Sequence, residues 1–382
     1  LVAALLARQA DNSGYRAVLD DLDISPWHPL IEAEGGIVPF AQGLYGCSEM
    51  FVHGLMVLVD AGIVRRKVYP DAERQALANA GMLDESLHTD GVCVHGGFIL
   101  GPASFYQRLR EVPHSKRSEF NMTAISFINE LYGQEALKRL QRRNARFVNS
   151  AFTMTLLGAG VADQLQDGRV LSGVGGQYNF VAQAHALHDA RSVIILRSWR
   201  ESGGEVSSNI VWEYGHCTIP RHLRDIVITE YGIADLRGKT DRKVIEALLN
   251  ITDSRFQTAL IEQAQHIGKL PKDFCLDPRF ANNSPERLHA IAARHPHLFP
   301  EYPLGCDFSA QEQDLLRALN WLKSKFKLTQ IYELGKATLD APAPHAFPEH
   351  LARMQLAKPT GLREELYQRL LLAGLQATAK PH

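Results

Sequence analysis

The stretch Ser192-Val-Ile-Ile-Leu196 is a short apolar run of the kind that forms a buried strand. Runs of the same type occur at Phe147–Ser150, Val170–Leu171 and Ile226–Thr229. Amphipathic stretches alternate with these runs, as at Phe127–Arg142 and Asp241–Ile251. Strands that alternate with helices are typical of parallel pairing with helical crossovers. The sequence therefore predicts an α/β fold in which a mostly parallel sheet is flanked by helices.

Prolines mark a change of character after about residue 275. They stand at Pro278, Pro285, Pro296, Pro300 and Pro303. Beyond them, Ser309 and Glu312 have the Ser-x-x-Glu spacing of a capping box, which predicts a helix from about residue 310. A second amphipathic helix is expected over Leu362–Leu375. Residues 276–382 are therefore expected to form proline-rich linkers and a helical carboxy-terminal extension.

The composition excludes several classes of partner. The 382 residues carry 41 Lys plus Arg against 42 Asp plus Glu, a net charge of -1, so no overall field attracts nucleic acid or an anionic membrane. The apolar runs are far shorter than the roughly 18–20 residues of a spanning helix. The five cysteines are scattered without a Cys-x-x-Cys pair, which favours a reducing cytoplasm over a disulfide or zinc framework.

The first candidate site is Gly43-Leu-Tyr-Gly-Cys-Ser-Glu-Met50, which precedes an apolar stretch that ends at Gly62. We expect Ser48 to cap a helix and Glu49 to lie in its first turn. The helix dipole and free N–H groups would keep the carboxylate of Glu49 ionised and fixed, so that it could act as a nucleophile. The alternative is that Glu49 merely completes a helix N-terminus.

The second candidate is Gly173-Val174-Gly175-Gly176-Gln177, which is expected to turn between a strand at Val170–Leu171 and a helix. Glycines let the backbone approach a ligand and direct N–H groups at an oxyanion or phosphate. The dinucleotide fingerprint fails here, because Tyr178 occupies the third glycine position. The acidic ribose ligand expected about 20 residues further on is also absent, which weakens a dinucleotide site. Arg197 at that place could instead suit a 2′-phosphate, so an NADP site is not excluded.

Other polar segments have structural interpretations. In Ile228–Lys239, Arg237 and Lys239 either hold a turn together or face a phosphate, and the structural role is favoured. The basic residues Lys138, Arg139, Arg142, Arg143 and Arg146 are interpreted as the solvated face of a helix. Cys93 with His95, and His185 with His188, lack metal-site spacing, so no metal is expected.

Three segments together resemble the acetyl-CoA hydrolase and acyl-CoA:carboxylate CoA-transferase family, which includes 4-hydroxybutyrate and succinyl-CoA:acetate CoA-transferases. The resemblance spans roughly residues 15–270 and is carried by Ser48-Glu49-Met50, by Gly168–Gln177 and by Thr229–Thr240. It implies a CoA-transferase-like fold, with residues 31–275 as the catalytic domain. Family members have a further α/β domain before the glutamate, so residues 1–30 are expected to be the end of a truncated amino-terminal domain.

The family resemblance also implies the chemistry. Glu49 stands at the position of the family's nucleophile, which forms an acyl-glutamyl anhydride and then a glutamyl-CoA thioester. A second carboxylate ends the cycle in a transferase, and water ends it in a hydrolase. The segment Gly173, Val174, Gly175, Gly176 and Gln177 is the candidate to bind coenzyme A, which is expected as a substrate and not as a permanently bound cofactor. The expected partners are acyl-CoA and small carboxylates, and the family makes a homodimer plausible.

Two departures from the family pattern keep an alternative open. His53 stands where the family often has Asp, and residues 182–191 lack the family's arginine and Gly-Gly pair. A non-catalytic CoA-binding relative therefore remains an alternative to the enzyme, and an NADP-dependent oxidoreductase is a more distant one.

Overall fold

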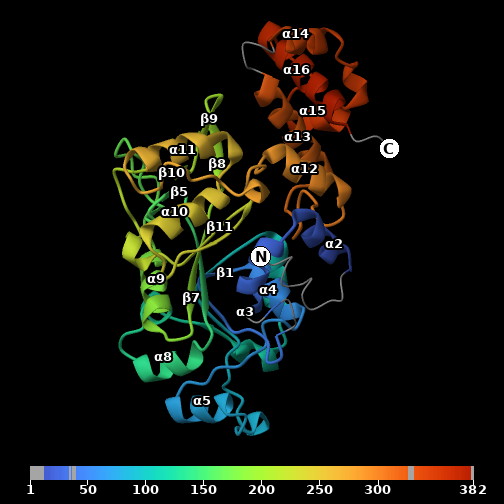
Figure 1. Cartoon of the computed structure of the whole chain (residues 1–382). Coiled ribbons are helices and arrows are strands. Elements are labelled where there is room, and N and C mark those ends of the chain that lie inside the picture. The colour runs from blue at the N-terminus through green and yellow to red at the C-terminus, as the bar shows by residue number, and fades with distance from the viewer. Residues whose placement is uncertain (1–12, 34–35, 37–39, 326–330, 380–382) are drawn as a thin grey trace. The chain divides into compact units, whose positions relative to one another are not determined.

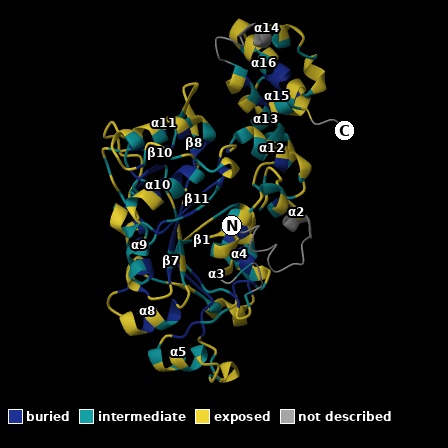
Figure 2. Ribbon diagram, in the orientation of Figure 1, coloured by how far each residue is buried: buried dark blue, intermediate teal, exposed yellow. Residues whose placement is uncertain are grey.

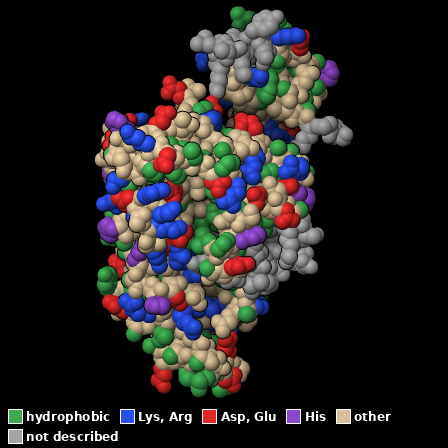
Figure 3. All heavy atoms as spheres, in the orientation of Figure 1, with side chains coloured by type: hydrophobic (Ala, Val, Ile, Leu, Met, Phe, Trp, Pro, Cys, Tyr) green, Lys and Arg blue, Asp and Glu red, His purple; other side chains and the backbone are tan. Residues whose placement is uncertain are grey.

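The computed structural model describes residues 13–33, 36, 40–325 and 331–379, and the chain divides into two compact units, Leu1–Leu304 and Gly305–His382 (Figure 1). The first unit combines parallel strands with flanking helices, which confirms the predicted α/β class. The described part of the second unit is made of helices only. Acidic and basic side chains are mixed over the visible face, as the near-zero net charge predicts (Figure 3).

The first sheet consists of β1 (Gly46–Val52), β2 (Val94–Leu100) and β3 (Phe120–Met122), all parallel and in that order. Two helices follow β1 and β2 directly, α4 (His53–Asp60) and α6 (Ala103–Arg110). Phe51, Met56, Val94 and Phe105 from these elements are buried in one hydrophobic cluster. Burial of such side chains contributes about 1.5–3 kcal/mol each, so this cluster fixes β1 in place.

The prediction that Ser48 caps a helix and that Glu49 lies in its first turn is wrong. Both residues belong to β1, and the helix begins at His53, with Val52 in the cap position. The reason is strand pairing, because Cys47, Ser48 and their neighbours are aligned with His95 and Gly96 of β2. This pairing and the burial of Phe51 outweigh the local capping preference of Ser48.

The second sheet has the order β12-β11-β7-β4, and all of its pairs are parallel except β11 with β12. Its strands are β4 (Arg146–Ser150), β7 (Arg191–Ile195), β11 (Ile226–Thr229) and β12 (Gly232–Asp235). They confirm the strands predicted at 147–150, 192–196 and 226–229. Helices α9 (Gln177–Ala186), α10 (Asp241–Asn250) and α11 (Ser254–His266) contribute to two buried clusters beside this sheet. Figure 2 shows how much of β7 and β11 is buried.

Short strands extend this unit. A small sheet has the order β10-β5-β6, and β8 pairs with β9 as a hairpin. Their ranges are β5 (Thr153–Thr155), β6 (Gly160–Val161), β8 (Trp199–Ser202), β9 (Glu205–Ser208) and β10 (Ile210–Val211). The strand predicted at Val170–Leu171 is not formed. Val170 makes only a single bridge, to Gln164. Val170 is 69% exposed and Leu171 is 59% exposed, because no described strand or helix covers them.

The helix predicted over Phe127–Arg142 is broken in two, α7 (Ile125–Asn129) and α8 (Glu135–Gln141). Gly133 lies in the break with a φ of 87°, a conformation that suits glycine. The break lets Lys138 and Arg142 turn inward toward the carbonyl oxygens of Glu130 and Phe127. The amphipathic pattern thus predicts helical structure correctly, but not the break between α7 and α8. The small helix α5 (Ala72–Asn79) packs beside α8.

Residues after 275 still belong to the first unit. Asn283 donates from Nδ2 to the carbonyls of Asn250 and Thr252, at 2.9 Å each, and Gln257 donates to the carbonyl of Phe280. The helix α12 (Pro285–Arg294) packs against α2 (Ser13–Leu22), and Trp27, just before α3 (His28–Ala33), lies against Phe280. The compact unit therefore runs to Leu304.

The second unit contains α13 (Ala310–Lys325), α14 (Ile331–Leu339), α15 (Pro348–Arg353) and α16 (Leu362–Thr378). Both helices predicted in this part, from about residue 310 and over 362–375, are confirmed. The capping box is complete, because the Ser309 N–H donates to Glu312 Oε2 and the Glu312 N–H donates to Ser309 Oγ. No helix among the described residues is long and apolar enough to cross a membrane.

Candidate active site

Glu49 lies within β1 between two residues paired with β2, Ser48 with Gly96 and Met50 with Phe98. Its side chain is half-buried. Asn129, the last residue of α7, donates a hydrogen bond from Nδ2 to Glu49 Oε1. A strand backbone paired with its neighbour and an amide donor from a helix thus fix the carboxylate from two directions.

The glycine loop, Gly173–Gly176, approaches the same carboxylate. A Cβ atom placed on Gly175 would lie 3.5 Å from Glu49 Oε2, and one on Gly176 would overlap the side-chain amide of Asn129. Gly175 has a φ of 59°, and Gly176 is buried. Glycine is therefore required at 175 by its backbone conformation and at 176 by the space that Asn129 occupies.

The structure thus brings Glu49 together with Gly175 and Gly176. Gln177 begins α9 and donates from Nε2 to the Ser150 carbonyl at 3.1 Å, which ties the loop to the end of β4. Gly173 and Val174 are exposed, and nothing lies within 4 Å of a Cβ placed on Gly173. No hydrogen bond from the N–H groups of Gly173 to Gly176 occurs among the described residues, so these donors are available to a ligand.

Asn129 belongs to a buried polar network that the sequence did not reveal. The Gln183 amide donates to the Asn129 carbonyl, and Arg142 donates to Gln183 Oε1 and, at 2.7 Å, to the Phe127 carbonyl. Asn129, Gln183 and Arg142 are all buried. These hydrogen bonds hold the Asn129 amide against Glu49, while Asn129 Oδ1 and Arg142 Nε find no hydrogen-bond partner among the described residues. A lone Asn in an amphipathic stretch carries no sequence signal for this role.

The interpretation of the basic residues around 138–146 as a solvated helix face is wrong for Lys138 and Arg142, which are buried. Arg143 and Arg146 are exposed but lie beyond the end of α8. Lys138 and Arg142 are each only 3% exposed, and neither pairs with a carboxylate among the described residues. Lys138 donates to the carbonyls of Glu130 and Tyr132 and lies 5.0 Å from the Phe127 ring centroid. Burial, and then the charge of Arg142, lower the pKa of Lys138. Carbonyl oxygens and an aromatic face replace the water that these cations lose.

His95 lies near this buried network, on the strand next to Glu49. Its Nδ1 is 2.7 Å from the Tyr45 hydroxyl, and its Nε2 is 3.3 Å from Asn121 Nδ2. Burial, and then the charge of Arg142, lower the pKa of His95 to about 4. Burial likewise raises the pKa of the Cys47 thiol. At neutral pH the imidazole and the thiol are therefore both uncharged.

The Ile228–Lys239 segment has the favoured structural role. It forms the β11–β12 hairpin, where Arg237 donates to Asp225 Oδ2 at 2.6 Å and Arg191 pairs with Asp225 and Asp235. Lys239 donates to the Asp235 carbonyl and pairs with its carboxylate at 3.3 Å. The NADP alternative loses its structural context, because residues 170–171 form no strand before the glycine loop and the loop faces a carboxylate.

The site of this α/β fold is thus a carboxylate on a parallel strand, with an amide donor at Oε1 and a glycine loop close to Oε2. Residues 101–264 match the acetyl-CoA hydrolase/transferase C-terminal domain. The resemblance predicted from the sequence motifs is therefore confirmed over residues 101–264. The matched range includes Asn129 and the glycine loop and begins after Glu49.

Several known proteins are similar to this chain. It is 26% identical over 217 residues to the 4-hydroxybutyrate coenzyme A transferase of Clostridium kluyveri, which covers 56% of this chain and 44% of that protein. It is 34% identical over 124 residues to a probable butyrate:acetyl-CoA coenzyme A-transferase of Syntrophomonas wolfei, covering 32% and 28% of the two chains. The crystal structure of RipA from Yersinia pestis matches 58% of this chain and 44% of its own at 22% identity, with a TM-score of 0.45. The chain thus spans less than half the length of these relatives.

Proposed function

We propose that this chain carries the glutamate of an acyl-CoA:carboxylate CoA-transferase and that Glu49 is the covalent nucleophile. The observation that carries the proposal is the position of Glu49, whose Oε1 accepts a hydrogen bond from Asn129 while its Oε2 faces Gly175. The relatives named as coenzyme A transferases supply the substrate class, an acyl-CoA and a small carboxylate. No permanently bound cofactor is required by this chemistry.

The proposed reaction is a sequence of exchanges at carbonyl carbons. A Glu49 oxygen attacks the thioester carbon of acyl-CoA, the C–S bond breaks, and an acyl-glutamyl anhydride forms while CoA leaves as thiolate. The thiolate then attacks Glu49 Cδ, the product carboxylate leaves, and a glutamyl-CoA thioester remains. A second carboxylate repeats these steps in reverse and restores Glu49. No net proton is transferred, so the site needs donors for oxyanions and not an acid or base.

Two groups beside Glu49 are suited to these oxyanions. The amide of Asn129 already faces the Glu49 carboxylate, so it can stabilise the oxygen charge that develops when Cδ is attacked. The N–H groups of the glycine loop have no acceptor among the described residues, and the loop approaches Glu49 Oε2 at Gly175. Donors that are fixed in advance stabilise the transition state without the reorganisation that water would need.

The test is the near-isosteric Glu49→Gln variant in an assay of butyryl-CoA formation from acetyl-CoA and butyrate. We expect a loss of at least about 10³-fold in kcat, because an amide cannot form the anhydride. Borohydride treatment of the wild type with acetyl-CoA, followed by peptide mass mapping, should find a reduced Glu49. Glu135→Gln, an exposed glutamate on α8, is the matched control and should keep full activity.

The assay also separates the related functions. Formation of butyryl-CoA without net thiol release supports a transferase, whereas net release of the CoA thiol supports a short-chain acyl-CoA hydrolase. Coenzyme A binding without turnover and without an adduct on Glu49 would identify a non-catalytic CoA-binding relative. An active Glu49→Gln protein, with deamidation excluded by mass, would rule out Glu49 as the nucleophile.

A further inference from the structure

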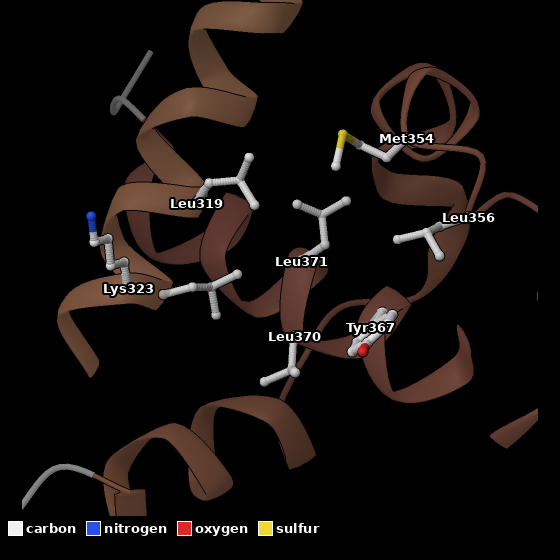
Figure 4. Close-up of a pocket in the computed structure, with 8 residues that line it drawn as sticks. Leu319, Lys323, Met354, Leu356, Tyr367, Leu370 and Leu371 are labelled. Atoms are coloured by element: carbon white, nitrogen blue, oxygen red, sulfur yellow. The ribbon is translucent and has the colours of Figure 1, made fainter. Parts of the chain in front are cut away.

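The helical second unit contains a pocket of about 520 Å³ between α13, α16 and the turn after α15 (Figure 4). This volume lies within the range of about 300–1,000 Å³ typical of small-molecule sites. Its wall is aliphatic and is formed by Leu319, Leu322, Met354, Leu356, Leu370 and Leu371. Figure 4 shows the side chains of Leu319, Met354 and Leu371 pointing toward one space.

The pocket borders the core of the unit and shares Leu371 with it. Leu315, Ala318, Leu372 and Leu375 are buried together with Leu371 in one cluster, so the helices pack without a ligand. At the rim, however, Leu319 is 41% exposed, Met354 37% and Tyr367 43%. Apolar side chains gathered around an open hollow leave surface in contact with water that an apolar ligand would cover. Leucine and methionine side chains adapt their shape readily to a flexible chain.

Two cations flank this apolar wall. Lys323 lines the pocket from α13, and its side chain is exposed. On α16, Arg363 donates from Nε to the Tyr367 hydroxyl at 2.8 Å, with its guanidinium 5.3 Å from the ring centroid. Neither Lys323 nor Arg363 pairs with a carboxylate in the described part of this unit, and Glu364 is hydrogen bonded to Thr360 instead. One cation, Lys323, thus lines the pocket, and a second, Arg363, is held by the lining residue Tyr367.

We propose that this pocket binds a medium-chain fatty acid, that is, one unbranched aliphatic chain ending in a carboxylate. The leucine and methionine wall would cover the chain, and Lys323 or Arg363 would face the carboxylate. An apolar wall favours binding of an aliphatic chain, and a nearby cation favours binding of an anionic head group. This site is separate from Glu49 and does not depend on the function proposed for it.

The first test is calorimetric titration of the whole chain with hexanoate, octanoate and decanoate, each below its micelle concentration. We expect one site, with affinity rising about three- to fourfold per added methylene group, because each buried CH₂ contributes about 0.8 kcal/mol. Decanol, which has the same chain without the charge, should bind at least fivefold more weakly than decanoate. Absence of saturable binding, or an affinity that does not change with chain length, would overturn the proposal.

Variants locate the site. Leu319→Asp places a negative charge on the exposed rim and should weaken decanoate binding at least tenfold. Lys323→Glu should weaken decanoate but not decanol. Leu339→Asp, on a 79% exposed residue of α14 outside the pocket, is the matched control and should bind like the wild type. All three positions are exposed, so thermal melting should confirm that each variant is folded.

Two further measurements distinguish a fatty-acid site here from binding at Glu49 and from a contact between copies of the chain. Glu49→Gln should bind decanoate as the wild type does, and a loss of binding there would assign the ligand to the candidate active site instead. Sedimentation should show that Leu319→Asp has the same association state as the wild type. The contrary outcome has three parts: the wild type self-associates, Leu319→Asp dissociates it, and decanoate does not change the association. In that case the pocket is a contact between copies of the chain, and the fatty-acid proposal is wrong.

Discussion

Asn129 contacts Oε1 of the Glu49 carboxylate from within a buried network, whereas Gly175 of the glycine loop approaches Oε2 from the surface. On the buried side, Asn129, Gln183 and Arg142 are hydrogen bonded in series. On the loop side, Gly173 to Gly175 are exposed, and Val174 between them is exposed as well. The buried side can keep the carboxylate in one position, and the exposed side can admit a large ligand. Substitutions on the two sides should therefore differ in kind.

The largest effect is expected from Asn129→Asp, which faces Glu49 with a second carboxylate. The amide donor is lost and like charges are placed in contact, so we expect kcat to fall by at least about 10³-fold. Asn129→Ala removes the donor alone and should cost about 10²- to 10³-fold. Steady-state assay of both variants, with melting curves as a fold control, measures the difference. Equal and small effects would show that the buried side does not position Glu49.

Gly176→Ala should reduce kcat by about 10²-fold, since its Cβ would overlap the Asn129 amide and displace it. The same overlap should lower the free energy of unfolding by about 1–3 kcal/mol. Gly173→Ala is the matched control in the same loop, because nothing lies within 4 Å of its Cβ. Kinetics and denaturant unfolding should leave Gly173→Ala within about twofold of wild type. A silent Gly176→Ala would contradict the close approach of the loop.

Gly175→Ala is expected to act more mildly, by about tenfold in kcat/KM. Its Cβ would make an ordinary 3.5 Å contact with Glu49, but a φ of 59° costs a non-glycine residue about 1–2 kcal/mol. The change should raise KM more than it lowers kcat if the exposed side mainly admits the ligand. A pure kcat effect would mean instead that both sides position the carboxylate.

The smallest effect is a pH dependence on the buried side. The pKa of His95 is about 4 in the folded chain and near 6.5 when unfolded, so folding favours the neutral ring. Its stabilising contribution is complete above about pH 6.5 and is lost as the pH falls toward 4. Between pH 7 and 5.5 this amounts to about 1 kcal/mol of unfolding free energy. Urea titrations at the two pH values should show this slope, and His95→Gln should flatten it.

The sequence predicted the parts of the fold that depend on local periodicity. The strands at β4, β7 and β11 and the helices α10, α13 and α16 were all expected, because each has its own apolar pattern or capping residues. The prediction failed where tertiary contacts decide. Ser48 and its neighbours pair with β2, which lies more than 40 residues further along the chain, and Gly133 ends a helix so that Lys138 can be buried.

The candidate site was predictable only in part. Glu49 and the glycine loop could be singled out because nucleophiles and oxyanion sites favour such residue types. Their approach to each other is a property of the tertiary structure. Asn129, Gln183 and Arg142 could not be found, since an asparagine, a glutamine and an arginine in amphipathic segments look like surface residues until their burial is known.

The segment from Asp277 to His295 has a practical consequence for dissecting the protein. Asn283 satisfies the carbonyls of Asn250 and Thr252, and Arg287 donates to the Leu22 carbonyl. Truncation at residue 275 would leave these buried acceptors open to solvent and would uncover the ring of Trp27 that rests on Phe280. Separate expression of the two units is therefore best attempted by dividing the chain near Leu304, where each half keeps its own partners.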